Sequence, residues 1–326
     1  MLERPTRVVV TGAAGFIGSH LCERLLSDGH SVVGIDSFSD YYARGLKEQN
    51  LETSRANPNF TLLEADLVAA DLQLVLEGAA VVFHLAGQEG ARPSWGDHFA
   101  RYVHDNIVAT QKLLEALRES PIQRLVFASS ESVYGDAVRF PTKETALPLP
   151  VSPFGMTKLA AEHLAFVYMR NFGIPVTSLR YFTVYGPRQR PDMAFFRFIE
   201  ALVANEEIEI FGDGEQTREF TYVSDAIDGT LKAASADVAG QIINLGGGSR
   251  VTVNRVLDTL GEISGIKPRR RHLPAAPGEP RHTGASINLA RERLGWEPRV
   301  SLRDGLTKQW EWFLATSPKS PKVASS

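Results

Sequence analysis

The stretch that decides the fold reads Val8-Val-Val-Thr-Gly12-Ala-Ala-Gly15-Phe-Ile-Gly18. Its β-branched run predicts a strand, its glycines a tight turn, and the residues that follow a helix. In such a unit the first glycine permits the turn, the second lets a pyrophosphate approach the backbone, and the third lets helix and strand pack closely. The stretch therefore predicts a dinucleotide site at a helix N-terminus, formed by Gly12, Gly15, Phe16, Ile17 and Gly18.

An acidic residue ends the next predicted strand. Asp36 follows a β-branched run over residues 31–35 and stands 18 positions after Gly18. A carboxylate at this place accepts hydrogen bonds from ribose hydroxyls and repels the 2′-phosphate of NADP. The sequence therefore predicts NAD as the cofactor.

Short apolar runs alternate with helical patterns over the first part of the chain. We expect strands at residues 8–11, 31–35, 61–64, 81–85, 124–129 and 175–181, and helices at 16–27, 98–117 and 156–171. This alternation predicts an α/β fold with a Rossmann-type, doubly wound parallel sheet. After residue 181 the glycine- and proline-punctuated pattern predicts a smaller C-terminal substrate-binding lobe.

The domain boundaries follow from these patterns. We expect an NAD-binding domain with the catalytic helix over residues 1–180, and a nucleotide-sugar lobe over 181–316 whose chain crosses back to the first domain. Residues 317–326 are rich in Ser, Pro and Lys, which predicts a disordered tail.

The composition excludes several classes of protein. The chain has 326 residues, 43% of them hydrophobic and 22% charged, with a net charge of −3 and a single cysteine. A nucleic-acid binder would carry a positive field, and a disulfide scaffold or a zinc site would need more cysteines. We therefore expect neither nucleic-acid nor membrane partners, no metal, and a cytoplasmic location.

The motifs along the chain, taken in order, resemble the extended short-chain dehydrogenase/reductase family, and within it the nucleotide-sugar epimerases and dehydratases. The resemblance implies NAD, a UDP-sugar substrate, and a homodimer formed through the helices at 98–117 and 156–171. Its most specific parts are residues 179–187, 190–194 and 211–225. It also implies further cofactor-binding residues, namely Asp66, Leu67, Leu85, Ala86, Gly87, Asn106, Lys158 and Tyr181.

The same resemblance implies a set of substrate-binding residues. Glu89 and Arg92 lie where the sugar-facing loop of the family begins. A guanidinium fork matches phosphate oxygens, and Glu279 could take the ribose hydroxyls of the nucleoside. Arg218 and Arg281 are the arginines expected to bind the diphosphate, and Arg190, in the motif at residues 190–194, is a further substrate-binding residue.

The catalytic helix departs from the family pattern. Relatives carry Tyr-x-x-x-Lys, a spacing that puts both side chains on one helix face. The lysine lowers the pKa of the tyrosine, whose phenolate takes the proton of a sugar hydroxyl while hydride leaves for NAD. In this chain Lys158 is present, but Phe154 stands where the tyrosine is expected. The usual general base is therefore missing.

An acid near the end of the active-site strand favours a rearranged enzyme. In sugar 4,6-dehydratases an Asp-Glu pair occupies the positions of residues 131 and 132, and its first acid protonates the departing C6 hydroxyl. Glu131, between Ser130 and Ser132, matches that acid, and together with Phe154 it resembles the 5,6-dehydratases of UDP-N-acetylglucosamine in antibiotic biosynthesis. We therefore expect a lyase that oxidises C4 of the UDP-sugar, eliminates water across C5 and C6 and returns the hydride, giving an exo-glycal.

Two alternatives remain open. The first is a UDP-sugar 4-epimerase of the UDP-glucuronate or UDP-N-acetylglucosamine type, because residues 183–194 closely follow the motif of those enzymes. The second is a catalytically silent protein that binds NAD and a UDP-sugar, because Phe154 cannot accept a proton.

Overall fold

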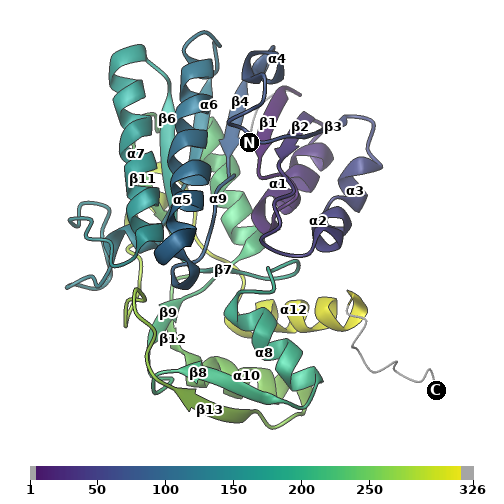
Figure 1. Cartoon of the computed structure of the whole chain (residues 1–326), viewed down its shortest axis with the longest axis vertical. Helices are drawn as coiled ribbons and strands as arrows, with labels where there is room; N and C mark the ends of the chain where they lie inside the picture. Colours follow the sequence, from purple (N-terminus) through teal and green to yellow (C-terminus); the bar gives the residue numbers. More distant parts are fainter. Residues whose placement is uncertain (1–4, 317–326) are drawn as a thin grey trace.

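Seven parallel strands form the main sheet of the computed structural model, which describes residues 5–316. Their order, β11-β6-β5-β4-β1-β2-β3, extends the strand order of a Rossmann fold (Figure 1). All six predicted strands are present, so the expected parallel α/β sheet is confirmed. The strands are β1 (Arg7–Thr11), β2 (Ser31–Asp36), β3 (Phe60–Glu64), β4 (Val81–His84), β5 (Arg124–Ser130), β6 (Val176–Tyr181) and β11 (Ile242–Leu245).

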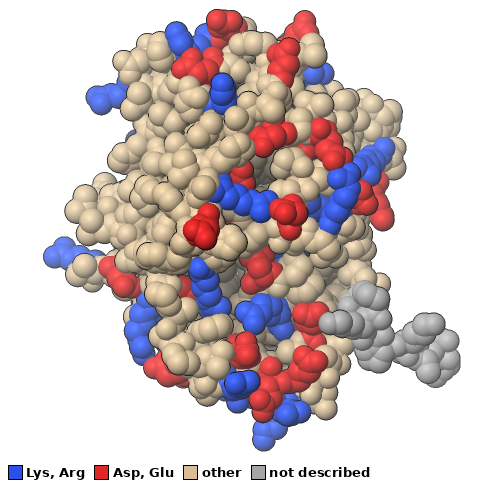
Figure 2. Space-filling model, viewed as in Figure 1, with Lys and Arg blue, Asp and Glu red and all other residues tan. Residues whose placement is uncertain are grey.

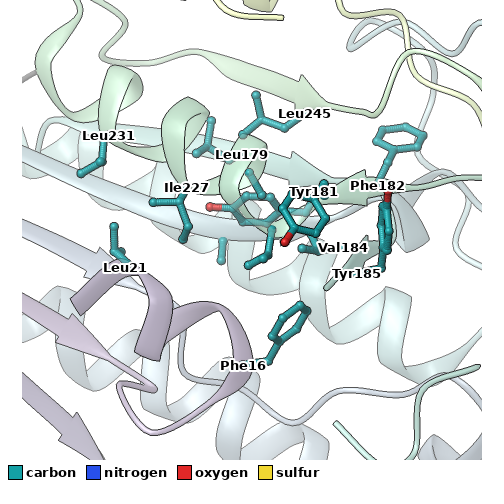
Figure 3. Packing of buried hydrophobic residues seen from close by; sticks show 14 of the residues in the cluster. Phe16, Leu21, Leu179, Tyr181, Phe182, Val184, Tyr185, Ile227, Leu231 and Leu245 are labelled. Carbon is teal, nitrogen blue, oxygen red and sulfur yellow. The ribbon is translucent and has the colours of Figure 1, made fainter. Parts of the chain in front are cut away.

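Helices cover both faces of this sheet. On one face α1 (Phe16–Ser27) packs beside α9 (Val223–Ser235). Figure 3 shows Leu21 of α1 and Ile227 of α9 converging with Leu179 of β6 in that core. The other face carries a second buried cluster beneath α4 (Leu72–Leu76), α6 (Ala109–Leu117) and α7 (Pro153–Phe172).

Two helices differ from their predicted form. The expected helix at 98–117 consists of α5 (Phe99–Tyr102), a π-helical segment η3 (Val103–Val108) and α6. The catalytic helix α7 begins three residues earlier than predicted, because Ser152 caps it: Ser152 Oγ accepts a 3.1 Å hydrogen bond from the Gly155 N–H, and a proline occupies the first turn.

The seventh strand was not predicted, and it comes from the C-terminal half of the chain. β11 pairs with β6 in parallel register, placing Leu245 beside Tyr181, and α9 contacts both β5 and β6. The chain thus returns to the main sheet after residue 181. Residues 317–326, for which we predicted a disordered tail, lie outside the described residues.

Several of the remaining elements after residue 181 form a smaller lobe below the sheet (Figure 1), whereas α11 (Asn288–Leu294) packs against α9 and against β11 of the main sheet. A helix, α8 (Ala194–Val203), packs on β8 (Glu207–Phe211), which pairs with β13 (Arg269–Leu273). A second helix, α10 (Val253–Ser264), follows the antiparallel pair of β9 (Thr217–Glu219) and β12 (Arg250–Thr252). The short strands and closing helices are β7 (Val184–Tyr185), β10 (Thr221–Tyr222), α11 (Asn288–Leu294) and α12 (Leu302–Thr316).

The strand register determines where a ligand can bind. It places Thr11 beside both Ile35 and His84, and Ser130 beside Tyr181, so the carboxyl ends of the strands meet at one edge. In open α/β sheets ligands bind at that edge. The connections that leave this edge contain short helices. They are α2 (Arg44–Asn50) and α3 (Glu52–Arg55) after β2, η1 (Arg92–Ser94) and η2 (Gly96–His98) after β4, and η4 (Glu131–Tyr134) after β5.

Candidate active site

A cavity of about 1010 Å³ lies between the carboxyl edge of the main sheet and the smaller lobe. In Figure 2 cationic and anionic side chains alternate around the hollow that separates the upper and lower parts of the molecule. The cavity is lined by the glycine turn at one end and by residues of β8 and β9 at the other. One continuous space therefore connects the predicted cofactor end with the predicted substrate end.

The glycine turn is closed to side chains. A Cβ atom on Gly18 would lie 2.0 Å from the Gly12 carbonyl oxygen, and one on Gly15 would lie 3.1 Å from the same atom. Gly12 itself has a φ of +71°. Gly15 caps α1 without a side-chain hydrogen bond, so backbone N–H groups are left for an anionic ligand. This geometry fits the pyrophosphate of a dinucleotide.

Asp36 ties the end of β2 to the glycine turn. Its Oδ2 accepts a 3.0 Å hydrogen bond from the Ala14 N–H, and its Oδ1 accepts a 2.8 Å bond from the Phe38 N–H. Lys47 Nζ lies 3.7 Å from Oδ1. The carboxylate also lines the cavity, where its remaining lone pairs can accept ribose hydroxyls. The other predicted cofactor residues that line the cavity are Phe16, Ile17, Asp66, Leu67, Leu85, Ala86, Gly87 and Tyr181.

Asn106 does not line the cavity, and it acts on the loop after β4 instead. Its Oδ1 accepts a 2.7 Å bond from the Gln88 N–H, while its amide nitrogen donates to the Gln88 carbonyl and to Thr157 Oγ1. A Cβ on Gly87 would lie 2.8 Å from Asn106 Oδ1. The π-helical turn thus places the Asn106 amide where it holds the loop after β4 against α7. Helical periodicity alone could not show this position of the side chain.

His84 forms a buried link between β1, β4 and α6. Thr11 Oγ1 lies 2.7 Å from Nδ1, and Thr110 Oγ1 lies 3.0 Å from Nε2. Burial lowers the pKa of His84 to about 3, so the imidazole stays neutral. The histidine therefore organises the strand ends and does not serve as an acid or base.

Phe154 lines the cavity, and the aromatic ring it contacts among the described residues is that of Tyr102. The two rings lie edge-on with their centroids 6.3 Å apart. Tyr102 is fully buried, and its hydroxyl bonds to the carbonyl oxygens of Glu89 and Gly90. Tyr102 therefore holds the loop after β4, and its proton is not available to a substrate.

Lys158 lies one helical turn further along α7 and is 4% exposed. Its Nζ stands 5.2 Å from the centroid of the Phe127 ring, and it forms no ion pair with any described residue. Burial lowers the pKa of Lys158, with Glu89 and Glu162 opposing that shift. A buried amine with a lowered pKa can exchange a proton near neutral pH more readily than an exposed lysine.

Glu131 begins the short helix after β5 and lines the cavity together with Ser130 and Ser132. Its Oε1 accepts hydrogen bonds from Thr183, at 2.6 Å from Oγ1 and 3.3 Å from the backbone N–H. Its Oε2 is buried and forms no hydrogen bond of normal geometry with a described residue, but the buried hydroxyl of Thr283 lies beside the carboxyl group. Burial raises the pKa of Glu131, against the bonds from Thr183 and the charge of Arg218.

The substrate end is built from charged side chains that pair with one another. Arg92 lies 2.5 Å from Glu279 and stacks over the Phe211 ring at 3.9 Å. Arg190 lies 2.9 Å from Asp192. These two arginines, with Arg218, Glu89 and Glu279, line the cavity.

Two arginines that seemed equivalent in the sequence differ in placement. Arg218 lines the cavity, donates to the carbonyl oxygens of Thr217 and Arg281, and lies 3.9 Å from Glu279. The Arg281 side chain is 63% exposed, pairs with Asp213 at 2.7 Å and lies outside the cavity lining. The structure therefore places Arg218, and not Arg281, in the wall of the cavity.

Several cavity residues were not predicted from the sequence. Tyr41, Tyr42 and Lys47 come from the loop and helix after β2, and Thr183 comes from the segment after β6. The first three follow the predicted acid Asp36 within a single loop, which was a usable signal. Thr183 belongs to the motif at residues 183–194, but only the tertiary structure places its hydroxyl against Glu131.

Two expected absences can be examined over residues 5–316. Within that range no cluster of His, Cys, Asp and Glu side chains could hold a metal ion. No helix of the described part is long and apolar enough to cross a membrane.

Comparison with known proteins identifies related chains. The model of the NAD dependent epimerase/dehydratase family matches residues 8–246. An uncharacterized UDP-glucose epimerase, YtcB, of Bacillus subtilis (strain 168) is 47% identical over 305 residues, covering 93% of this chain and 96% of that protein. The crystal structure of UDP-glucuronic acid 4-epimerase from Bacillus cereus, in complex with UDP-glucuronic acid and NAD, has a TM-score of 0.93 and 43% identity, covering 95% of this chain and 100% of that one.

These relatives confirm the resemblance at the level of the family, whose dependence on NAD confirms the expected cofactor. The dehydratase prediction is wrong, and the 4-epimerase alternative is better supported. TunA, an NDP-hexosamine 5,6-dehydratase of tunicamycin biosynthesis, is only 26% identical, at a TM-score of 0.86. The prediction rested on two positions, Glu131 and Phe154, and the similarity of the whole chain to 4-epimerases outweighs that local resemblance.

Proposed function

Because the chain belongs to the NAD dependent epimerase/dehydratase family, we propose that it is an NAD-dependent 4-epimerase of UDP-sugars. The observation that carries this proposal is one continuous cavity, which extends from the glycine turn to the arginines of the smaller lobe. Between these two ends it is lined by Gly87, and the Lys158 amine lies 3.8 Å from the position of a Cβ atom on that glycine. The Bacillus subtilis and Bacillus cereus relatives, which align over almost their whole length and are more similar to this chain than TunA is, are named as UDP-sugar epimerases.

NAD, when bound, accepts a hydride from C4 of the sugar and later returns one. The residues of the cofactor end fit such a group: the closed glycine turn takes the pyrophosphate and Asp36 takes a ribose. Gly87 and Tyr181 line the cavity at the sheet edge, where the nicotinamide would lie. The deep cavity keeps bulk water from the reacting carbon.

The C4 hydroxyl proton needs an acceptor other than Phe154. We assign this role to Lys158, because it is buried, forms no ion pair with a described residue, and lies close to the cavity wall at Gly87. In its neutral form the amine takes the proton as C4 is oxidised, and the resulting ammonium gives it back when C4 is reduced on the opposite face. A protonated Lys158 also stabilises negative charge on the C4 oxygen.

The UDP group would be held by the smaller lobe. Arg218 and Arg92 line this end, and each guanidinium offers donors to phosphate oxygens. Both arginines approach Glu279, which keeps them in place before a substrate arrives. Holding the nucleotide there leaves the sugar free to turn and present either face of C4.

Direct assay tests the proposed function. The NAD-loaded protein is incubated with UDP-glucose, UDP-glucuronate and UDP-N-acetylglucosamine, and products are followed by mass spectrometry and proton NMR. We expect an isomer of unchanged mass, inverted at C4. Loss of water with vinyl signals would contradict the proposal, and no turnover on any sugar would favour a silent binding protein.

We also propose that the chain forms a homodimer through α5, α6 and α7. Three large apolar side chains of α7 are exposed in the single chain: Met156 (40%), Val167 (51%) and Phe172 (49%). Light scattering after gel filtration should give twice the chain mass. A monomer at micromolar concentration would contradict this part of the proposal.

A further inference from the structure

The loop after β7 forms part of the cavity wall. Residues 184, 190 and 192–195 of this connection line the cavity. The path of the loop is irregular, since Gly186 has a φ of +140° and Arg188 a φ of +65°. Two backbone hydrogen bonds stay within residues 186–193, each between residues three positions apart. The position of the loop therefore depends on the elements that pack against it.

Arg190 is the cation that this loop brings to the cavity. Its side chain is 17% exposed, and the charge of Glu89 on the loop after β4 acts on it. The guanidinium donates to Asp192 through Nε at 2.9 Å and through Nη2 at 3.0 Å. The Tyr41 hydroxyl adds a 3.2 Å bond to Asp192 from the loop after β2. Because Asp192 belongs to the same loop as Arg190, the direction in which the guanidinium points is set by the loop backbone.

A buried glutamine of the C-terminal helix holds that backbone. Gln309 of α12 is fully buried, and its Oε1 accepts a 3.1 Å hydrogen bond from the Gly186 N–H. Its Nε2 donates to Gln189 Oε1 at 2.8 Å. Gln189 in turn accepts from the Phe196 N–H at 3.1 Å and donates to the Val184 carbonyl oxygen at 3.3 Å. The two amides thus join the start, the middle and the end of the loop.

This arrangement needs a side chain that accepts and donates at once. The Gly186 N–H requires an acceptor and Gln189 Oε1 a donor, and a primary amide supplies both. Without the amide of Gln309 the Gly186 N–H would be buried and unpaired, and Gln189 would lose the bond that orients it. Arg190 follows Gln189 directly in the chain. A disturbance of Gln189 is therefore passed to Arg190.

A second anchor keeps the loop attached when Gln309 is changed. His20 Nε2 of α1 lies 2.9 Å from the Pro187 carbonyl oxygen, and Arg188 donates to Glu23 of α1 at 2.7 Å. Both contacts involve loop residues that precede Gln189. Removal of the Gln309 amide should therefore release the side of the loop that carries Arg190, while the fold stays intact.

We infer that Gln309 is a positioning residue of the substrate site: through Gln189 it holds the Arg190 guanidinium in the orientation in which it meets the UDP-sugar. This inference rests on the proposed function, because it assumes a UDP-sugar in the cavity. A guanidinium that is already held in place loses less conformational entropy when a ligand binds. The helix α12 thereby affects affinity, although none of its residues, all of them within the described part of the chain, lines the cavity.

A double-mutant cycle on the NAD-loaded full chain tests the inference. Calorimetric titration gives the Kd values of UDP-glucose and UDP-glucuronate for the wild type, Gln309→Leu, Arg190→Gln and the double variant. We expect Gln309→Leu to raise the Kd of the tighter-binding sugar about tenfold, but less than about twofold when Arg190 is already replaced. An unchanged Kd in Gln309→Leu, or the same rise in both backgrounds, would overturn the inference, because general damage to the fold does not depend on Arg190.

Two further variants keep the test independent of stability. Gln309→Glu is isosteric and keeps the acceptor for the Gly186 N–H, but its carboxylate cannot donate to Gln189, so it should raise the Kd at least about threefold. Gln73→Leu of α4 is the matched control, because Gln73 donates to the Ala116 carbonyl oxygen at 3.1 Å and lies outside the cavity lining. Its Kd should equal that of the wild type. A rise as large as that of Gln309→Leu would mean that loss of any such amide weakens binding, and the inference would fail.

The inference and the proposed function fail in different ways. If the cycle behaves as expected but no sugar is epimerised, the proposed function fails and the inference stands for a protein that binds UDP-sugars. If C4 epimerisation is observed while Gln309→Leu and Gln309→Glu bind like the wild type, the inference alone fails. Binding of neither sugar by the wild type would also overturn the inference, because Arg190 would then meet no UDP-sugar.

Discussion

The two ends of the cavity are built on different principles. At the cofactor end the walls are backbone atoms of a glycine turn, and a single added methyl group would meet a carbonyl oxygen at 2.0 Å. At the substrate end the walls are long charged side chains on loops, which pair with one another as Arg92 does with Glu279. The first end has one shape, while the second can be changed one side chain at a time.

This difference explains how a family keeps one cofactor and varies its substrates. A backbone site tolerates no substitution that fills it, because the chain itself would have to move. A binding site built from side chains changes its charge and shape when a loop residue is substituted, while the fold stays the same. Phe154, the departure from the family pattern, and Glu131 both lie at the cavity wall, where side chains decide the chemistry.

The largest effect is expected from Gly18→Ala. The new Cβ would overlap the Gly12 carbonyl, so the turn must open, at a cost of about 5 kcal/mol or more. We expect loss of copurifying NAD, measured by chromatography after denaturation, and a lower Tm. Gly45→Ala is the matched control, because a Cβ there meets nothing within 4 Å. If the Gly18→Ala variant retained NAD, the backbone of the glycine turn would not be what shapes the cofactor end of the cavity.

The cofactor half also contains a buried ion pair of side chains, whose contribution to stability can be compared with that of an exposed pair. Glu162 of α7 and Arg180 of β6 form a fully buried ion pair at 2.5 Å, and Ser178 donates a third bond to Glu162. Glu162→Gln should lower the free energy of unfolding by about 3–5 kcal/mol, because it leaves Arg180 buried and uncompensated. Asp28→Asn removes an exposed pair with Arg24 and should cost about 0.5 kcal/mol or less. Denaturant titration compares the two, and similar losses would refute the argument.

Phe154→Tyr places a phenol where none exists. If Lys158 is the general base of the wild-type protein, activity requires its neutral form and rises as pH increases through its lowered pKa. A tyrosine beside a protonated Lys158 would ionise more easily, so the variant should be about 100-fold faster near neutral pH and should reach its plateau at lower pH. Phe172→Tyr, on the exposed part of α7, should leave the pH–rate profile unchanged. An unaltered profile in Phe154→Tyr would exclude this role for residue 154.

The smallest effects concern the two arginines of the substrate end. Arg218→Gln should weaken binding of UDP about tenfold, since one charged donor to phosphate is lost. Arg281→Gln should change the Kd of UDP less than about twofold, because that side chain is exposed and outside the cavity lining. Titration with UDP alone separates them. Equal losses would mean that Arg281 turns inward when the nucleotide binds.

Prediction from sequence succeeded where the signal was local. β2 and β5 were placed within one residue of their ends, and α1 was placed at both ends, because their apolar periodicity is set by neighbours along the chain. The π-helical turn at Asn106 and the strand β11 were missed. A π-turn depends on the loop that its side chain holds, and a short strand is indistinguishable from other apolar runs until its partner β6 is known.

The sequence by itself determined the cofactor half, the family and the absence of a tyrosine at residue 154. Each of these can be recognised from short local motifs, because the spacing of neighbouring residues fixes the turn or helix face that they form. Only the tertiary structure decided what the substrate half can do. It separated Arg218 from Arg281, buried Lys158 without a carboxylate partner among the described residues, and turned Thr183 onto Glu131. These facts depend on contacts between residues far apart in the chain, where packing and charge, and not periodicity, set the chemistry.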